Sequence, residues 1–271
     1  MLIDVSKWNG NIDYAKVKTE TDSVIIRAAS GTGTDTMFYK NIDGALKQNM
    51  KVGVYVYSKA KTTSAAESEA KHVLDILYPY VDRLYYPIFF DSEEKGTEKN
   101  AKACAQAFIN KINADGRFKA GVYASSSWWN SYLGGLTGSF TVWKAQWGSK
   151  QPSGADIWQY SDNGRVKGIT GSVDLNKVIS YQPAPLPPRP KEHFMIELEV
   201  LRNGDSGIQV RTIQRLLKEL NYKGANGKDL VIDGDFGQNV ETAVRSFQKA
   251  AGLKVDGVCG QATWSFLLKG Q

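Results

Sequence analysis

Residues 86–93 read Tyr86-Pro-Ile-Phe-Phe-Asp91-Ser-Glu93, an aromatic and apolar segment that ends in two carboxylates. The apolar residues predict a buried β-strand. Asp91 and Glu93, two residues apart, project to the same side of an extended chain, whereas Glu94 points away. An apolar wall and a neighbouring negative charge both favour the protonated form of a carboxyl group, which suits general acid chemistry near neutral pH. Taken alone, the segment is explained equally well by a solvated acidic turn.

The chain around this segment alternates strand and helix patterns. Five apolar, β-rich segments, separated by segments of helical period, occupy residues 2–5, 23–28, 52–57, 86–91 and 119–124. Three shorter strands, which follow closely on one another, occupy residues 141–147, 156–160 and 172–175. Strand–helix alternation implies a parallel sheet with right-handed crossovers. The pattern predicts an α/β fold over residues 1–181, a compact (β/α)5β3 TIM-like barrel of eight strands.

Polar residues gather at the ends of these strands, where parallel barrels place their chemistry. The strand ends carry Asp4, Arg27, Tyr57, Asp91, Tyr123 and Asp174. A closed barrel would bring Asp4 and Asp174 close to the carboxylates of the opening segment. Nearby aromatic residues, Trp8 and Trp147 among them, suggest a groove that stacks on sugar rings, although core packing explains several of the aromatic residues. Trp143 and Trp147, four apart in one predicted strand, are expected to face the same side.

A proline-rich segment divides the chain. Five of the eight prolines lie in residues 182–190, a composition that favours an extended linker, assigned here to residues 182–193. Beyond it, an internal repeat pairs Asp233-Gly-Asp-Phe-Gly-Gln238 with Asp256-Gly-Val-Cys-Gly-Gln261, and each copy leads into a segment of helical period. Residues 194–271 are therefore predicted to form a small all-α module of three helices.

Composition excludes several classes of protein. No apolar stretch approaches the roughly 18 residues of a membrane span, so membrane insertion is not expected. Two cysteines and two histidines leave few ligands for a zinc hydrolase, and no metal or cofactor is predicted. The net charge of +6, without an arginine-rich run, favours attraction to a polyanionic surface over sequence-specific nucleic-acid binding. The first residues lack the features of a signal peptide, which suggests synthesis without a secretion signal.

Eight short motifs, taken in their order, resemble the family 25 glycoside hydrolases, lysozymes that cleave peptidoglycan. The motifs are Asp4-Val-Ser-Lys-Trp8-Asn-Gly10, Ile25-Ile-Arg27, Gly53-Val-Tyr-Val-Tyr57, Phe90-Asp91-Ser-Glu93, Gly121-Val-Tyr123, Trp143-Lys-Ala-Gln-Trp147, Trp158-Gln159-Tyr160 and Val173-Asp174-Leu175. The resemblance implies an N-acetylmuramidase with Glu93 as general acid and Asp91 as its catalytic partner, acting through the substrate's own N-acetyl group. The side chains that line the substrate site would be those of Asp4, Asp174, Arg27, Tyr57, Tyr123, Trp147 and Gln159.

The second half resembles a three-helix peptidoglycan-binding module, which implies bacterial peptidoglycan as the partner. Together the two halves suggest a phage-type endolysin, made in the host cytoplasm and acting on the wall after release. A second hypothesis is a non-catalytic wall-binding protein on an inactivated barrel. The presence of Asp4, Asp91, Glu93 and Asp174 counts against that alternative.

Overall fold

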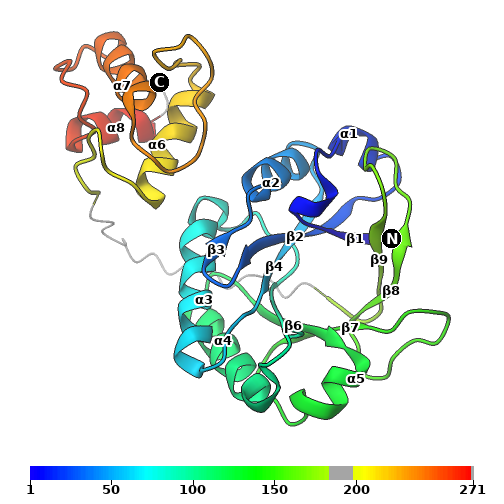
Figure 1. The fold of residues 1–271 in the computed structure, drawn as a ribbon. Coiled ribbons are helices and arrows are strands. Elements are labelled where there is room, and N and C mark those ends of the chain that lie inside the picture. Colours follow the sequence, from blue (N-terminus) through cyan, green and yellow to red (C-terminus); the bar gives the residue numbers. More distant parts are fainter. Residues whose placement is uncertain (183–197, 270–271) are drawn as a thin grey trace. The chain divides into compact units, whose positions relative to one another are not determined.

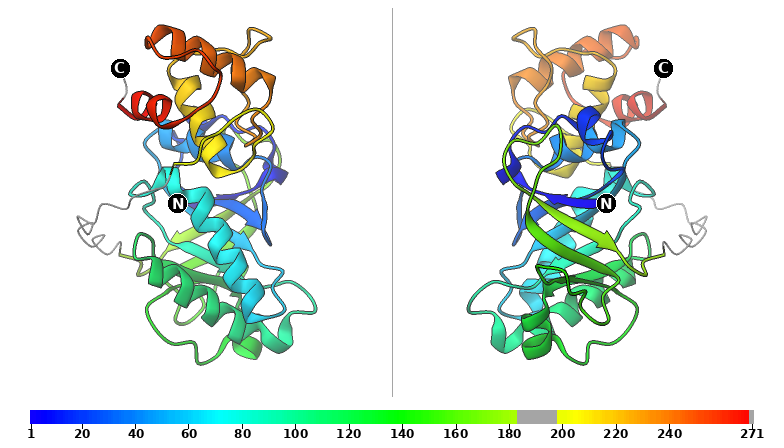
Figure 2. Two further views of the ribbon diagram at one scale, coloured as in Figure 1. Left: turned by 90° about the vertical axis from the view of Figure 1, so that its left-hand side faces the viewer. Right: turned by 90° about the vertical axis from the view of Figure 1, so that its right-hand side faces the viewer.

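The computed structural model of the chain describes residues 1–182 and 198–269 (Figures 1 and 2). The chain divides into two compact units, Met1–Pro190 and Lys191–Gln271. The linker expected at 182–193 lies outside the described residues except for Gln182, as does the start of the expected module at 194–197. None of the described helices combines the length and the apolar character that crossing a membrane requires.

Eight strands close into a barrel in the first unit (Figure 1). They are β1 (Leu2–Val5), β2 (Ser23–Ser30), β4 (Lys51–Tyr57), β5 (Ile88–Asp91), β6 (Ala120–Ser125), β7 (Thr141–Ala145), β8 (Ile157–Gly164) and β9 (Val173–Val178). Around the ring the order is β1, β9, β8, β7, β6, β5, β4 and β2, and pairing of β1 with β2 closes it. A short strand, β3 (Gly33–Thr34), forms a hairpin with β2. The predicted eight-stranded barrel is confirmed.

Helices of unequal length cover the outside of the barrel (Figure 2). They are α1 (Tyr14–Val17), α2 (Phe38–Lys47), α3 (Thr63–Leu77), α4 (Ala101–Asp115) and α5 (Ser126–Trp128). Only α2, α3 and α4 are full helices, because α1 and α5 span 4 and 3 residues. Short turns join these elements: η1 (Lys7–Asn9), η2 (Tyr78–Tyr80), η3 (Glu98–Asn100) and η4 (Trp129–Leu133).

The last strand departs from the parallel arrangement expected from strand–helix alternation. Six neighbouring pairs, from β1–β2 to β7–β8, are parallel, but β9 runs antiparallel to both β8 and β1. The connection between β8 and β9 covers only residues 165–172, which is too short for a crossover to a parallel strand. Asp174 therefore lies near the start of β9, not at its end. The reversal still brings Asp174 to the site, where it pairs in register with Asp4.

Alternation along the strands separates two apolar layers. Residues such as Leu2, Ile25, Phe89 and Trp143 fill the inside of the barrel, while the intervening residues pack outward against the helices. The interior is tight enough to demand glycine on β6, since a Cβ atom on Gly121 would lie 2.3 Å from Cδ1 of Phe89. The barrel mouth, where the parallel strands end in polar residues, therefore lies directly above a densely packed apolar interior.

The second unit contains the three predicted helices, α6 (Ile208–Glu219), α7 (Gln238–Ala250) and α8 (Gln261–Lys269). The repeated Asp-Gly turns are held in the same way by a buried glutamine. Gln214 donates to Oδ1 of Asp233 at 2.7 Å and accepts from the N–H of Gly234 at 2.9 Å. Gln248 makes the equivalent bonds, both 2.9 Å, with Asp256 and Gly257. The repeat is thus a structural unit.

Gly121→Ala should destabilise the barrel by about 1 to 3 kcal/mol, because the added methyl group overlaps the Phe89 ring inside a packed layer. Gly134→Ala is the matched control, since a Cβ atom there meets no atom within 4 Å and its φ of −58° suits alanine. Thermal unfolding of the two variants measures the difference. Equal stability of both would contradict the close packing described here.

Candidate active site

Asp91 forms one wall of the barrel mouth. It ends β5, in register with Tyr57 of β4 and Tyr123 of β6, and its side chain is buried. Its Oδ1 atom accepts no hydrogen bond from the described residues. Burial raises the pKa of the Asp91 carboxyl well above its usual value, the charges of Glu93 and Asp4 raise it further, and the Arg27 guanidinium opposes them.

Glu93 lies just beyond the end of β5 and is accessible to solvent. Loss of hydration in the barrel mouth raises the pKa of its carboxyl above the ordinary value, and the charges of Asp174 and Glu94 add to that rise. The preceding Ser92 anchors this turn, because its N–H donates to the carbonyl of Tyr123 at 2.9 Å. An accessible carboxyl that holds its proton to higher pH is what a general acid requires.

Asp4 and Asp174 form the opposite wall, since β9 is four strands from β5 in the ring of eight. Asp4 is buried at the end of β1, and Asp174 is half-buried. Burial raises the pKa of Asp4 well above its usual value, and the charge of Asp174 raises it further. Burial also raises the pKa of Asp174, which the hydrogen bond with Asp4 partly offsets. The structure thus brings together all four carboxyl groups expected from the sequence.

Two amide side chains hold Asp4. Its Oδ2 atom accepts from Nε2 of Gln159 at 3.0 Å and from Nδ2 of Asn176 at 2.7 Å. Each amide is fixed in turn, because the Tyr123 hydroxyl donates to Gln159 at 2.9 Å and the Trp143 indole N–H donates to Asn176 at 2.8 Å. Gln159 and Tyr123 therefore belong to the site by contact.

Sequence reasoning missed Asn176, which is fully buried beside Asp4. The strand expected at 172–175 ends three residues short of the observed strand, because β9 continues to Val178. Alternation from Asp174 would have placed Asn176 on the same face of a longer strand. A second residue that escaped notice is Asp35, the partner of Arg27.

Arg27 is buried and ion-paired. Its Nε atom lies 2.6 Å from Oδ2 of Asp35. The same carboxylate accepts from the backbone N–H groups of Lys7 and Met37 at 3.2 and 2.9 Å. Arg27 therefore braces the loops beside β1 and β2, and its charge acts on Asp91 across the interior.

Tyr57 contacts a residue that was expected to point away from the groove. Its hydroxyl donates to Oε2 of Glu94 at 2.6 Å. The expectation for Glu94 is wrong because β5 ends at Asp91, so strict alternation does not continue through residues 92–94. Glu94 links the loop after β5 to the end of β4.

Trp143 and Trp147 do not share an environment. Trp143 is buried inside the barrel, whereas Trp147 is 64% exposed. The strand expected at 141–147 ends at Ala145, so the side-chain direction of Trp147 is set by the following loop. The Trp147 ring is thus exposed to solvent, and its role in stacking on a ligand stays a prediction.

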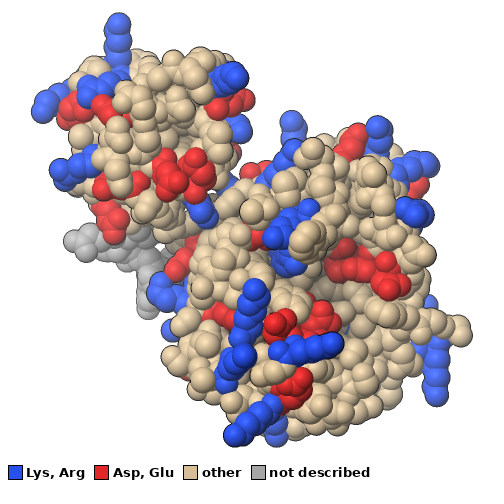
Figure 3. Space-filling model, viewed as in Figure 1, with Lys and Arg blue, Asp and Glu red and all other residues tan. Residues whose placement is uncertain are grey.

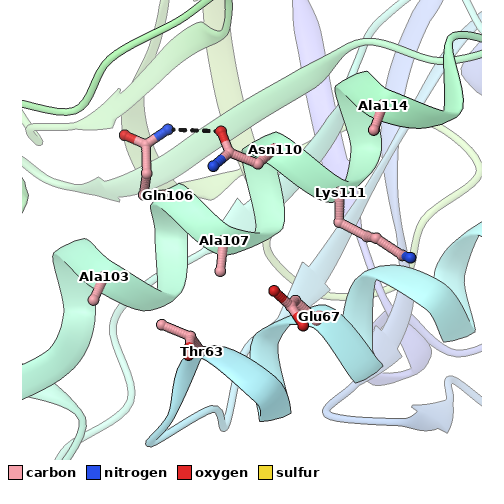
Figure 4. Close-up of a pocket in the computed structure, with 8 residues that line it drawn as sticks. All are labelled: Thr63, Glu67, Ala103, Gln106, Ala107, Asn110, Lys111 and Ala114. Carbon is pink, nitrogen blue, oxygen red and sulfur yellow. Dashed lines mark hydrogen bonds between the residues drawn. The ribbon is translucent and has the colours of Figure 1, made fainter.

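The surface agrees with this location. In Figure 3 acidic side chains gather around a hollow on one face of the larger unit, with lysine and arginine side chains nearby. A different hollow, of about 620 Å³, lies outside the barrel between α3 and α4 (Figure 4). Its lining residues are Thr63, Glu67, Ala103, Gln106, Ala107, Asn110, Lys111 and Ala114. With one carboxylate and no aromatic ring in that lining, it does not match the acid–aromatic site at the barrel mouth.

The described residues contain no group of three or more His, Cys, Asp or Glu side chains placed to hold a metal ion. Of the carboxyl groups in the mouth, Asp4 instead accepts hydrogen bonds from the amides of Gln159 and Asn176 and interacts with Asp174.

A barrel with an accessible acid and a buried carboxyl partner at the ends of its strands is the architecture of a glycoside hydrolase. Comparison with known families agrees. The chain belongs to glycosyl hydrolases family 25, whose profile matches residues 3–169. Residues 206–267 match the family described as a putative peptidoglycan binding domain.

The chain is similar to several known proteins. The chain is 27% identical to an autolytic lysozyme of Clostridium acetobutylicum, over 96% of this chain and 76% of that protein. It is 29% identical to lysozyme M1 of Streptomyces globisporus, over 65% of this chain and 66% of that protein. Among solved structures, the catalytic domain of the endolysin ply40 from Listeria monocytogenes bacteriophage P40 aligns with a TM-score of 0.59 and 28% identity, covering 66% of this chain and 92% of that one.

The buried carboxyl of Asp91 should lower the stability of the fold as pH rises. Its raised folded-state pKa means that the folded chain retains a proton that the unfolded chain has lost, so stability falls as pH increases above the unfolded value. Asp91→Asn should therefore be more stable than the parent at pH 7, and the difference should shrink as the pH falls towards 3. Thermal unfolding across this pH range measures the effect.

Asp13→Asn provides a control of opposite sign. Asp13 accepts from the N–H of Lys16 at the start of α1, and that bond lowers the pKa of the Asp13 carboxyl. The ionised carboxylate therefore stabilises the fold above the unfolded pKa, and this stabilisation is lost as the pH falls. A loss of stability in Asp91→Asn at pH 7 would contradict this prediction, because it would mean that the fold stabilises the charged form of Asp91.

Proposed function

We propose that the protein is an N-acetylmuramidase that hydrolyses the β-1,4 bond between N-acetylmuramic acid and N-acetylglucosamine in peptidoglycan. The observation that carries the proposal is the accessible Glu93, with a raised pKa, beside the buried Asp91 in a family 25 barrel. Support comes from the lysozymes among its relatives and from a similar fold, the autolysin LytC of Streptococcus pneumoniae, solved with a synthetic peptidoglycan ligand. LytC aligns with a TM-score of 0.56 and 25% identity, over 65% of this chain and 45% of that one.

In the proposed reaction, Glu93 donates its proton to the glycosidic oxygen as the bond to the anomeric carbon breaks. The carbonyl oxygen of the substrate's N-acetyl group closes onto the anomeric carbon and takes the place of an enzyme nucleophile. Asp91 orients this group, because its buried Oδ1 accepts no hydrogen bond from the described residues and can receive one from the amide N–H. Water then attacks the anomeric carbon, the bond from that carbon to the N-acetyl oxygen breaks and regenerates the N-acetyl group, and the water's proton passes to Glu93.

The other residues of the mouth bind and shape the substrate. Asp174 stands across the groove from Glu93 and raises its pKa, so it helps to keep the acid protonated. Asp4 is fixed by its two amide partners and supports Asp174. Tyr57, Tyr123, Gln159 and Trp147 complete the sugar-binding surface, while Arg27 acts through its charge on Asp91.

We further propose that the helical unit anchors the enzyme to peptidoglycan and that the chain acts as an endolysin on the bacterial wall, after synthesis in the host cytoplasm. The family match of residues 206–267 supports the first point, and the similarity to a phage endolysin supports the second. The chain is also 43% identical, over 65 residues that make up 24% of each chain, to a zinc D-Ala-D-Ala carboxypeptidase of Streptomyces albus G. The alternative of an inactivated barrel is disfavoured by the four assembled carboxyl groups.

Glu93→Gln should lower turnover by about 10²- to 10⁴-fold, because glutamine keeps the shape of the side chain but has no proton to donate. Glu94→Gln is the matched control, since its amide oxygen can still accept the hydrogen bond from Tyr57. Release of reducing ends from purified peptidoglycan, with mass spectrometry of the products, measures both. Near-normal turnover by Glu93→Gln, or a greater loss in the control, would refute the assignment.

A chain that ends after residue 182 should keep the barrel's activity on small soluble muropeptides, because each unit has its own apolar core. On intact walls it should be several-fold slower, since it lacks the tether that raises its local concentration at an insoluble substrate. Rates on the two substrates, each relative to the full chain, test this division. Equal rates on walls would mean that the helical unit does not anchor the enzyme.

A further inference from the structure

None of the described residues forms a hydrogen bond with the carboxyl of Glu93, the proposed general acid. The rise in its pKa comes instead from burial and from the charges of Asp174 and Glu94. A general acid must point accurately at the oxygen that it protonates, because small errors in geometry cost much of the rate. The direction of Glu93 must therefore be set by the backbone on either side of it, at Ser92 and Glu94.

The chain that follows Glu93 is fixed through Glu94. The carboxylate of Glu94 accepts from the Tyr57 hydroxyl at the end of β4. Its backbone carbonyl accepts from the N–H of Thr97 at 3.2 Å and from the hydroxyl of the same residue at 2.7 Å. These bonds hold a tight turn immediately after the acid.

The chain that precedes Glu93 is fixed through Ser92, which is buried. Its N–H is bonded to the carbonyl of Tyr123 on β6, as described above. In addition, its Oγ atom accepts from the indole N–H of Trp128 at 3.3 Å. The side-chain bond gives Ser92 a second point of attachment, so the peptide between Ser92 and Glu93 cannot rotate without breaking it.

Trp128 is anchored independently of the barrel mouth. It lies in α5, which starts directly after β6, and its own N–H is capped by Oγ of Ser125 at 3.2 Å. The half-buried ring packs against the apolar layer outside the barrel and meets Tyr132 edge-on, with the two ring centres 4.8 Å apart. The indole N–H of Trp128 is therefore a donor in a fixed place.

The next residue offers a natural comparison. The Nε1 atom of Trp129 is also buried, yet it has no hydrogen-bond partner among the described residues. The ammonium group of Lys144 lies 5.2 Å from the centre of the Trp129 ring, a contact that does not involve the indole N–H. Two adjacent tryptophans thus pack against the same barrel, and of the two only Trp128 donates to the segment that carries Glu93.

We propose that Trp128 is a positioning residue that orients Glu93 through the hydrogen bond to Ser92. This inference rests on the proposed muramidase activity, in which Glu93 protonates the leaving oxygen. When the bond is lost, the peptide before Glu93 can shift and proton transfer becomes less efficient. Substrate binding depends on other residues of the mouth, so the loss falls on kcat and not on KM.

The test uses the full chain and measures kcat and KM on purified peptidoglycan glycan strands. Trp128→Phe keeps an aromatic ring but removes the donor, and Ser92→Ala removes the acceptor. Each should lower kcat by roughly 2- to 10-fold with KM little changed, the effect expected for one hydrogen bond. The double variant should be no worse than the more impaired single variant, because both changes remove the same bond.

Trp129→Phe is the matched control. It makes the same chemical change one residue away but removes an N–H that has no partner among the described residues, so kcat should not change. Thermal unfolding of every variant shows whether a loss of activity arises from a loss of folded protein.

A second substrate separates misplacement of the acid from a general disturbance of the site. A disaccharide of N-acetylglucosamine and N-acetylmuramic acid that carries a dinitrophenyl leaving group needs no proton from the enzyme, because dinitrophenolate departs as a stable anion. Variants in which only the acid is misplaced should therefore cleave this substrate at the rate of the parent.

The outcomes separate this inference from the proposed function. Losses on glycan strands that do not multiply in the double variant, and that vanish with the dinitrophenyl substrate, support it. Unchanged kcat in the single variants, multiplied losses in the double variant, equal losses on both substrates or an equal loss in Trp129→Phe would overturn it and leave the muramidase proposal standing. Failure of the parent enzyme to cleave glycan strands would overturn the proposed function itself.

Discussion

The confinement of four carboxyl groups in the mouth of one closed barrel is the constraint on which the rest of the structure depends. Asp4 and Asp91 are only 6% and 4% exposed, so water cannot stabilise their charges. The fold compensates unevenly. Asp4 receives two amide donors, while Asp91 has the distant charge of Arg27 and a buried oxygen that accepts no bond from the described residues. Because these partners do not fully offset burial and mutual repulsion, the carboxyl groups have raised pKa values, and among them is the proposed general acid Glu93.

The antiparallel β9 makes this arrangement possible. A parallel eighth strand would end at the mouth, whereas β9 begins there, and its first residues supply both Asp174 and Asn176 to the wall opposite Asp91. Asn176 donates a hydrogen bond to Asp4 in the mouth and accepts one from Trp143 in the barrel interior. Hydrogen bonds thus link the polar mouth to the apolar interior below it. The tightly packed floor, with its required glycine at position 121, keeps the carboxyl groups in place.

Much of this could be predicted from the sequence, because the strands of the barrel are short apolar runs bounded by polar residues. Asp91 was located by the contrast between an aromatic strand and the carboxylate that ends it, a signal contained within a few residues. The direction of β9 and the role of Asn176 could not be predicted in the same way. Both depend on the short loop at 165–172 and on pairing of β9 with β1, a strand that is distant in the sequence. The partner of Glu94 was also misjudged, because alternation is a property of regular strands and β5 stops at Asp91.

The central claim is that the charge across the groove helps to keep Glu93 protonated, and the pH dependence of kcat/KM for Asp174→Asn tests it most directly. The basic limb of the profile reports the pKa of the general acid in the free enzyme. Among the charged neighbours of Glu93, Asp174 has the largest effect on that pKa. The account predicts that removing the charge moves the basic limb to lower pH, with the fold intact. A basic limb that stays in place or moves to higher pH would contradict it.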